Sequence, residues 1–152
     1  METKTLKIEI PKGYEIDKEK TTFENNVLKK IDDVVIKWDD EYKGVVINIE
    51  DEYFIVDASK PSYFCSWCDA MKFHGNGIWG LPTLKQVQIL AKYIDAINET
   101  ILDNGGYEIA GKCYWSCKEK DKSVAWMVSL NDGYTTIYDK CNNLFVRAVF
   151  TL

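Results

Sequence analysis

The chain has 152 residues and a formal net charge of −5, from 19 Lys and Arg against 24 Asp and Glu, with one histidine. Hydrophobic residues make up 46% and charged residues 28%, so the chain can bury a core and fits one domain with at most a small appendage. The acidic balance argues against general nucleic-acid binding. A single histidine leaves almost no material for a histidine-centred triad or a multi-histidine metal site, and we expect no cofactor.

Membrane and secretion signals are missing from the sequence pattern. No run of about 18 apolar residues occurs, so we expect no membrane insertion. Residues 1–10 lack the apolar stretch of a secretory signal peptide. We therefore expect a cytoplasmic or virion-associated protein.

Residues 1–38 are predicted to form an N-terminal β element or docking segment. Apolar and polar residues alternate over 5–10, as in a half-buried strand. A further short strand is expected at 33–38. The polar run Asp39-Asp40-Glu41 marks the expected boundary, or seam, between two domains, so a second domain is expected over 39–152.

Two apolar, β-branched runs, 44–49 and 53–57, are predicted to pair as a hairpin across an acidic turn. Residues 58–80 contain one proline, three glycines, several aromatic residues and the pair Cys65 and Cys68. This composition predicts a loop. A loop of that length in a compact domain is usually functional or packed by its own side chains.

An amphipathic helix, or two short helices in tandem, is predicted over 83–104. Apolar residues recur there at steps of three and four, with charged residues between them. Thr83 as the N-cap with Gln86 three residues later is the pattern of a capping box. Asn104-Gly105-Gly106 supplies the C-terminal stop. The average length of protein helices favours two helices.

After the helical region the apolar pattern changes to a period of two residues, which predicts four antiparallel strands. Their expected ranges are 113–117, 124–130, 134–138 and 144–150. Asp132-Gly133, between the second and third ranges, predicts a tight hairpin because such a turn needs a positive φ. The predicted fold class is therefore α+β.

Residues 79–149 carry five short motifs in order. The motifs are Trp79-Gly80-Leu81-Pro82-Thr83, Tyr114-Trp115-Ser116-Cys117-Lys118-Glu119, Ala125-Trp126-Met127-Val128, Asn131-Asp132-Gly133 and Val146-Arg147-Ala148-Val149. This order resembles the DUF1566 family, the Lcl C-terminal domain, whose usual pattern is W-R-L-P-T, Y-W-S-S-T-E, A-W-x-V, a glycine turn and V-R-A-V. The opening, residues 7–17, resembles the start of short proteins of gut Bacteroides and their prophages.

The resemblance implies a C-type-lectin-like fold for 39–152, a twisted antiparallel sheet with one or two helices. Gly80 stands where the family usually has Arg, so any contact made by that Arg is absent here. Cys117 and Lys118 replace a Ser and a Thr of the usual pattern. Formylglycine-generating enzymes of this general fold bind copper through a cysteine pair, but their motif context is not visible in this chain, so that activity is not implied.

The sequence and the resemblance favour a non-catalytic function. The expected function is recognition of a glycan or a surface protein, in a prophage or virion context. C-type-lectin-like domains commonly place ligand contacts on loops beside the C-terminal strands, and Tyr and Asn are adaptable contact residues. The candidate ligand-binding residues are Asn131, Asp132, Tyr134, Tyr138, Asp139, Asn142 and Asn143. For each of them the alternative is an ordinary turn residue. A homo-oligomer or a phage structural protein is compatible with the same sequence.

A cysteine-dependent metal-binding or redox protein is the alternative function. The four thiols that could hold a tetrahedral zinc are Cys65, Cys68, Cys113 and Cys117. The first two also have the C-x-x-C spacing of redox proteins. Five cysteines cannot all pair within one chain, which favours free thiols packed as small hydrophobic groups. His74 is the only imidazole available for a Cys/His site.

Arg147 lies among apolar residues of the last predicted strand. It is either outward-facing or buried and paired with a carboxylate, and we favour a structural pairing over a ligand contact. Trp115 and Trp126 are expected in the core because large rings dominate core burial. Trp79 is expected to anchor the start of the helix.

Overall fold

The computed structural model describes residues 14–16, 28–30, 34–73 and 77–152. Contacts divide the chain into two units, 1–33 and 34–152. In the first unit, β1 (Tyr14–Ile16) and β2 (Leu28–Lys30) pair in an antiparallel sense. The strand predicted at 5–10 lies outside the described residues.

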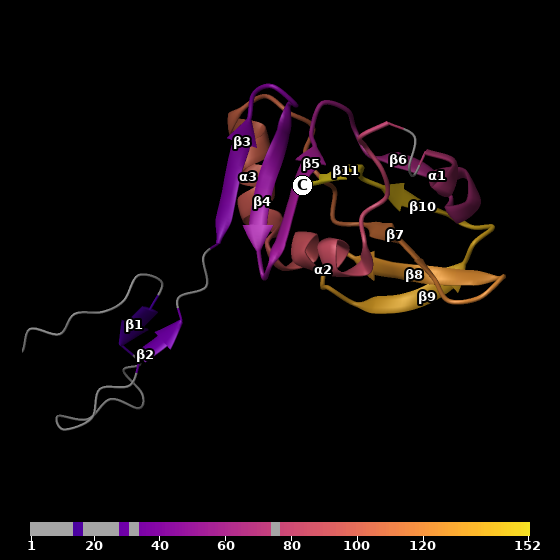
Figure 1. Cartoon of the computed structure of the whole chain (residues 1–152). Helices are drawn as coiled ribbons and strands as arrows, with labels where there is room; N and C mark the ends of the chain where they lie inside the picture. The colour runs from indigo at the N-terminus through magenta and orange to yellow at the C-terminus, as the bar shows by residue number, and fades with distance from the viewer. Residues whose placement is uncertain (1–13, 17–27, 31–33, 74–76) are drawn as a thin grey trace, which may run out of the picture. The chain divides into compact units, whose positions relative to one another are not determined.

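The strands of the second unit form two sheets (Figure 1). The four-stranded sheet has the order β11-β5-β4-β3, and all of its neighbouring strands are antiparallel. Its strands are β3 (Val35–Asp39), β4 (Gly44–Ile49), β5 (Glu52–Asp57) and β11 (Val149–Thr151). Since β3 pairs with β4 through Asp39, the seam predicted after residue 38 falls inside a strand, and the boundary between the units lies earlier, after residue 33.

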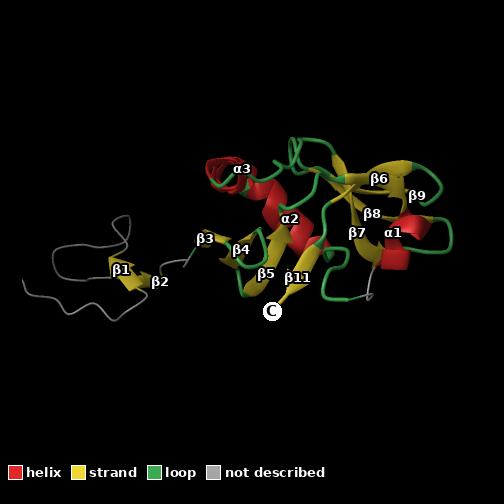
Figure 2. Cartoon of the chain, turned by 90° about the horizontal axis from the view of Figure 1, so that it is seen from above, coloured by secondary structure: helices red, strands yellow, loops and turns green. Residues whose placement is uncertain are grey.

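The second sheet is five-stranded and has the order β6-β10-β7-β8-β9. Its strands are β6 (Tyr63–Ser66), β7 (Cys113–Glu119), β8 (Val124–Ser129), β9 (Thr135–Asp139) and β10 (Asn143–Val146). Three helices accompany the two sheets: α1 (Trp67–Phe73), α2 (Leu84–Lys92) and α3 (Ile94–Asp103). Helix α3 packs on β3 and β4, and α2 packs on β7 and β8 (Figure 2). Helix α1 lies beside β6 and β10 (Figure 1). The predicted α+β class is confirmed.

Local signals in the sequence account for the α2–α3 segment. The Thr83 hydroxyl accepts from the Gln86 N–H at 3.1 Å, and the Gln86 side chain accepts from the Thr83 N–H at 2.9 Å, which completes the predicted capping box. The helical region divides at Tyr93 into two helices, in agreement with the prediction made from the average length of protein helices. Gly105 follows the second helix with a φ of +74°, the left-handed conformation that glycine adopts most easily.

The β4–β5 and β8–β9 hairpins are also confirmed. Gly133 has a φ of +79° in the β8–β9 turn. The two residues of the β4–β5 turn, Glu50 and Asp51, both have positive φ, as a tight primed turn requires. Lys85 and Lys92 of α2 form ion pairs with the Glu50 carboxylate at 2.8 and 3.1 Å, and these pairs link the helix to the turn.

The prediction of a loop over 58–80 is wrong in part, because β6 and α1 lie within it. Both elements are short, and their sequence is rich in aromatic residues rather than clearly periodic. Helix α1 has only seven residues and begins after Ser66, whose hydroxyl accepts from the Asp69 N–H at 3.2 Å. Trp67 and Ala70 of α1 bury their side chains. Tertiary packing, not local propensity, therefore forms this helix.

The prediction of a single strand over 144–150 is also wrong, because the chain leaves one sheet and enters the other at Arg147. Strand β10 pairs with β7 in a parallel sense, at Phe145 opposite Tyr114, so the prediction of purely antiparallel strands fails there. After the break, β11 joins the four-stranded sheet beside β5. Apolar residues on both sides of Arg147 cannot reveal such a change of sheet, because both halves remain strands.

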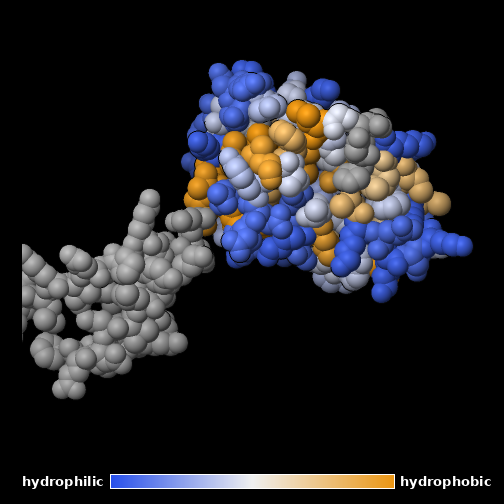
Figure 3. Space-filling model, viewed as in Figure 1, coloured by the Kyte–Doolittle hydropathy of each residue, from blue (hydrophilic) through white to orange (hydrophobic). Residues whose placement is uncertain are grey.

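Two apolar clusters fill the interior. The larger one joins β4 and β5 to α2 and α3, and it includes Tyr114 and Val128 of the second sheet. The smaller one surrounds Trp115, which is fully buried as expected, and includes Trp67 and Met127. Figure 3 shows hydrophobic residues over the four-stranded sheet with hydrophilic residues around them. No helix within the described ranges is long and apolar enough to cross a bilayer.

Arg147 joins the loops at the point where the chain changes sheets. Only 2% of the residue is exposed. Its Nη1 donates to the carbonyls of Asp57 and Lys60, both at 3.0 Å, and to the Tyr107 carbonyl at 2.8 Å. Its Nη2 donates to the Glu108 carbonyl at 2.7 Å. The expected structural role is therefore present, but the acceptors are main-chain carbonyls and not a carboxylate.

The remaining guanidinium donor extends the network to the second sheet. Arg147 Nε donates to the Ser62 hydroxyl at 3.1 Å, and that hydroxyl shares a hydrogen bond of 2.9 Å with the Tyr114 hydroxyl. Burial lowers the pKa of Arg147, while Tyr114 and Asp57 act to raise it. A guanidinium remains charged at neutral pH, so this is a buried cation held by oxygen dipoles.

Arg147→Met is expected to lower the free energy of unfolding by about 3 kcal/mol or more, because several buried carbonyls would lose their donor. Arg147→Lys should recover only part of the loss, since one ammonium cannot replace the planar fork. Urea denaturation followed by tryptophan fluorescence measures both. The control is Lys122→Met, in an exposed loop, which should change the free energy by no more than about 0.5 kcal/mol. Equal effects of Arg147→Met and Lys122→Met would contradict the structural role.

Candidate functional site

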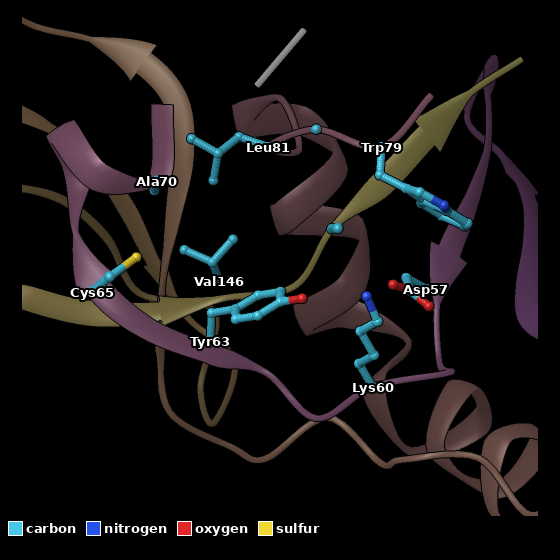
Figure 4. A pocket seen from close by; sticks show the side chains of 10 residues that line it. Asp57, Lys60, Tyr63, Cys65, Ala70, Trp79, Leu81 and Val146 are labelled. Atoms are coloured by element: carbon cyan, nitrogen blue, oxygen red, sulfur yellow. The ribbon is translucent and has the colours of Figure 1, made fainter. Parts of the chain in front are cut away.

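A pocket of about 180 Å³ lies where the chain passes between the two sheets (Figure 4). It is lined by residues from five separate segments of the chain. These are Asp57, Lys60, Tyr63, Cys65, Ala70, Trp79, Gly80, Leu81, Val146 and Ala148. A concave site with an apolar lining and a few polar groups is the usual form of a ligand pocket.

Trp79 forms a fixed aromatic wall of this pocket. Its ring lies 6.3 Å from the Tyr42 ring and 6.2 Å from the Phe150 ring, both in edge arrangements. The next residue, Gly80, exchanges two main-chain hydrogen bonds with Val149, each of 2.9 Å. Trp79 is only half-buried, so it is a pocket wall more than the core anchor that the sequence predicted.

Asp57 supplies the buried polar group of the pocket and is 8% exposed. Its Oδ1 accepts from the Ser59 N–H at 2.9 Å and from the Ser59 hydroxyl at 2.6 Å. No residue in the described ranges donates to its Oδ2. Figure 4 shows the Asp57 carboxylate at the same end of the pocket as Trp79 and Lys60. One carboxylate oxygen therefore remains available to accept a hydrogen bond from a ligand.

Lys60 and Tyr63 lie along one side of the pocket. Lys60 is exposed, and its ammonium forms no ion pair with any residue that the structure describes. Tyr63 presents its ring to the pocket, and its hydroxyl points toward the end that holds Lys60 (Figure 4). The site thus combines a carboxylate acceptor, an ammonium donor and two aromatic rings.

Arg147 fixes the main chain at the polar end of the pocket. The carbonyls of Asp57 and Lys60 both accept from its Nη1, so one guanidinium fixes the main chain at both residues. The Asp57 N–H also donates to the Ala148 carbonyl at 3.0 Å. The residues that would contact a ligand are therefore supported by a rigid set of main-chain hydrogen bonds.

The opposite end of the pocket is apolar. Its lining side chains are Cys65, Ala70, Leu81 and Val146. Burial, and to a smaller degree the nearby Asp69 carboxylate, raises the pKa of the Cys65 thiol. Cys65 is therefore a neutral thiol at physiological pH and behaves as a small apolar group.

The seven residues predicted to bind ligand lie in two groups, one at each end of β9. Asn131, Asp132 and Tyr134 precede β9, whereas the other four lie at or beyond its far end, where β9 turns into β10. Two of the carboxylates have local turn roles: Asp132 accepts from the Tyr134 N–H at 2.9 Å, and Asp139 accepts from the Cys141 N–H at 2.8 Å. The strand separates the two groups, and neither group lines the pocket.

The cysteines of the alternative function are all free thiols. Within the described ranges, no three His, Cys, Asp or Glu residues are grouped so that they could hold a metal ion. Cys65 lies in β6, one residue before its end at Ser66, and Cys68 is the second residue of α1, so the C-x-x-C does join a strand to a helix, in contrast to the predicted loop. Cys113 and Cys117 lie on β7 and pack against the smaller apolar cluster. His74 lies outside the described residues.

Comparison with protein-family models found no match, and a search of curated proteins found none either. The resemblance to the DUF1566 family therefore stays a prediction. Sequence reasoning missed the pocket because its polar and aromatic members are far apart in the chain. The nearest signal was Trp79-Gly80 before the helix, which was interpreted as structural.

The reactivity of the thiols is a test of this geometry. Burial raises the pKa values of Cys65 and Cys117, so both are expected to react slowly with iodoacetamide at neutral pH. Cys68 and Cys141 are exposed and should be alkylated first. Peptide mass spectrometry over a time course measures the order. If Cys65 reacts fastest, it is an activated thiolate, and the cysteine-dependent alternative would gain support.

Proposed function

We propose that this chain is a non-catalytic recognition domain of DUF1566, C-type-lectin-like type, which binds one unit of a glycan in the pocket between its sheets. A prophage- or virion-associated setting is part of the same proposal. The support from the sequence is the order of the five motifs over 79–149. Two of these motifs contribute to the pocket. One supplies Trp79, which forms a wall, and the other supplies Arg147, which binds the main-chain carbonyls of Asp57 and Lys60.

The observation that carries the proposal is the buried Asp57, with one carboxylate oxygen free, beside the aromatic ring of Trp79. Hydroxyl groups of a sugar are natural donors to such an oxygen, and the Lys60 ammonium can donate to sugar oxygens. An aromatic ring offers a large, rigid apolar surface for the C–H face of a sugar ring. These are the groups that recognise a polyhydroxylated ring without making or breaking a bond.

A recognition role also agrees with the chemistry that the pocket contains. A nucleophilic mechanism needs an activated nucleophile within hydrogen-bond reach of a base. Cys65 has a raised pKa, and no hydrogen bond joins it to any base in the described part of the chain. Surface-protein recognition is the second form of this proposal, and the turns at either end of β9 would then supply contacts outside the pocket.

Asp57→Asn and Trp79→Ala are each expected to weaken glycan binding at least tenfold, a change of about 1.4 kcal/mol in binding free energy. The amide keeps the shape of Asp57 but removes its charge, and alanine removes the aromatic wall. Isothermal titration with a ligand found on a glycan array measures both, and circular dichroism checks that the variants fold.

Tyr134→Ala tests whether the ligand binds in the pocket or at the β8–β9 hairpin. Tyr134 is 63% exposed and is not one of the residues that line the pocket. The proposal expects Tyr134→Ala to retain binding within about twofold, a few tenths of a kcal/mol. Loss of binding in Tyr134→Ala with full binding in Asp57→Asn would transfer the site to the β8–β9 turn.

A further inference from the structure

The pocket between the sheets has two chemically different ends. Asp57, Lys60 and Trp79 gather at one end in Figure 4, and Cys65 and Ala70 lie at the other. The apolar end carries no charged side chain and no hydroxyl among its lining residues. A ligand that fills the whole pocket must therefore be polar on one side and apolar on the other.

An unmodified hexose does not meet this requirement. Its ring carries hydroxyl groups around its whole edge, so a hexose that reached the apolar end would leave a hydroxyl there without a partner. Burying an unpaired hydroxyl is unfavourable, whereas burying a methyl group is favourable. The lining thus selects a sugar that replaces one hydroxyl by a group with an apolar tip.

The size of the pocket limits how large that group can be. At about 180 Å³ it is smaller than the roughly 300–1,000 Å³ of sites for drug-sized ligands. It can hold one sugar unit or part of one, but not a long acyl chain. The rest of a glycan would extend outside the pocket.

We infer that the ligand unit is an N-acetylated amino sugar, an inference that rests on the glycan-binding function proposed above. The acetyl methyl occupies the apolar end, beside Cys65 and Ala70. The sugar ring lies against Trp79. The ring hydroxyls donate to the free oxygen of Asp57 and accept from Lys60. A single unit of this class offers a methyl group to the apolar end and hydroxyls to the polar end, which neither a hexose nor an unacylated hexosamine does.

The first test compares sugars that carry an N-acetyl group with sugars that lack it. N-acetylglucosamine and N-acetylgalactosamine are titrated into the full chain, beside glucose, galactose and glucosamine, and binding is followed by ligand-observed NMR. The expected result is that the N-acetyl sugars bind at least tenfold more tightly than the sugars that lack the acetyl group. Equal binding of all five sugars would overturn the inference and leave glycan recognition intact.

The second test narrows the apolar end. Cys65→Ile adds bulk at the residue that lines this end, and its matched control is Cys68→Ile, the same change on the exposed α1 residue outside the pocket lining. Cys65→Ile is expected to reduce N-acetyl sugar binding to the level of the hexoses, while Cys68→Ile leaves it unchanged. A preference for N-acetyl sugars that survives Cys65→Ile would overturn the placement of the acetyl group.

A protein ligand would give a different pattern. N-acetyl-leucinamide serves as a probe for an apolar side chain carried on a peptide. Binding of this probe, with no binding of any sugar, would overturn both the inference and the proposed glycan function and would favour surface-protein recognition. Sugar binding that lacks the acetyl preference overturns only the inference, so the two failures are distinguishable.

Discussion

The buried guanidinium of Arg147 is the interaction on which the described domain most depends. A cation in the interior is unfavourable unless its hydrogen bonds are all satisfied, and here four main-chain carbonyls and one hydroxyl accept from it. The accepting groups lie at the end of β5, in the loop that follows it, and in the loop that precedes β7. One side chain thus ties these segments together where the chain passes from β10 to β11.

The pocket is a consequence of the same crossing. Because β10 and β11 belong to different sheets, the segments before β6 and before α2 must bridge the space between them. Arg147 fixes the main chain of Asp57 and Lys60 on one side, and the Gly80–Val149 bridge fixes Trp79 on the other. Side chains supported in this way lose little conformational freedom when a ligand binds, which favours specific recognition.

The parts of this fold that the sequence predicted are those encoded by neighbouring residues. The capping box at Thr83, the stop at Gly105 and the turn at Gly133 depend on contacts within a few residues, and each is present. Helix α1 was missed because its stability comes from packing of Trp67 and not from a periodic pattern. The acceptors of Arg147 were missed because every residue carries a main-chain carbonyl, so the sequence does not show which carbonyls accept. The pocket was missed because only the tertiary fold brings Asp57 to Trp79.

Chemical-shift mapping is the measurement to make first. A ¹H–¹⁵N NMR titration of the full chain with a glycan ligand follows the indole N–H of Trp79 beside those of Trp38 and Trp126, which lie on β3 and β8 outside the pocket lining and serve as internal references. If the pocket binds the ligand, the Trp79 indole and the Asp57 amide shift while the two reference indoles change little. Shifts confined to residues 131–134 or 139–143 would contradict the pocket and return the binding site to the hairpin loops.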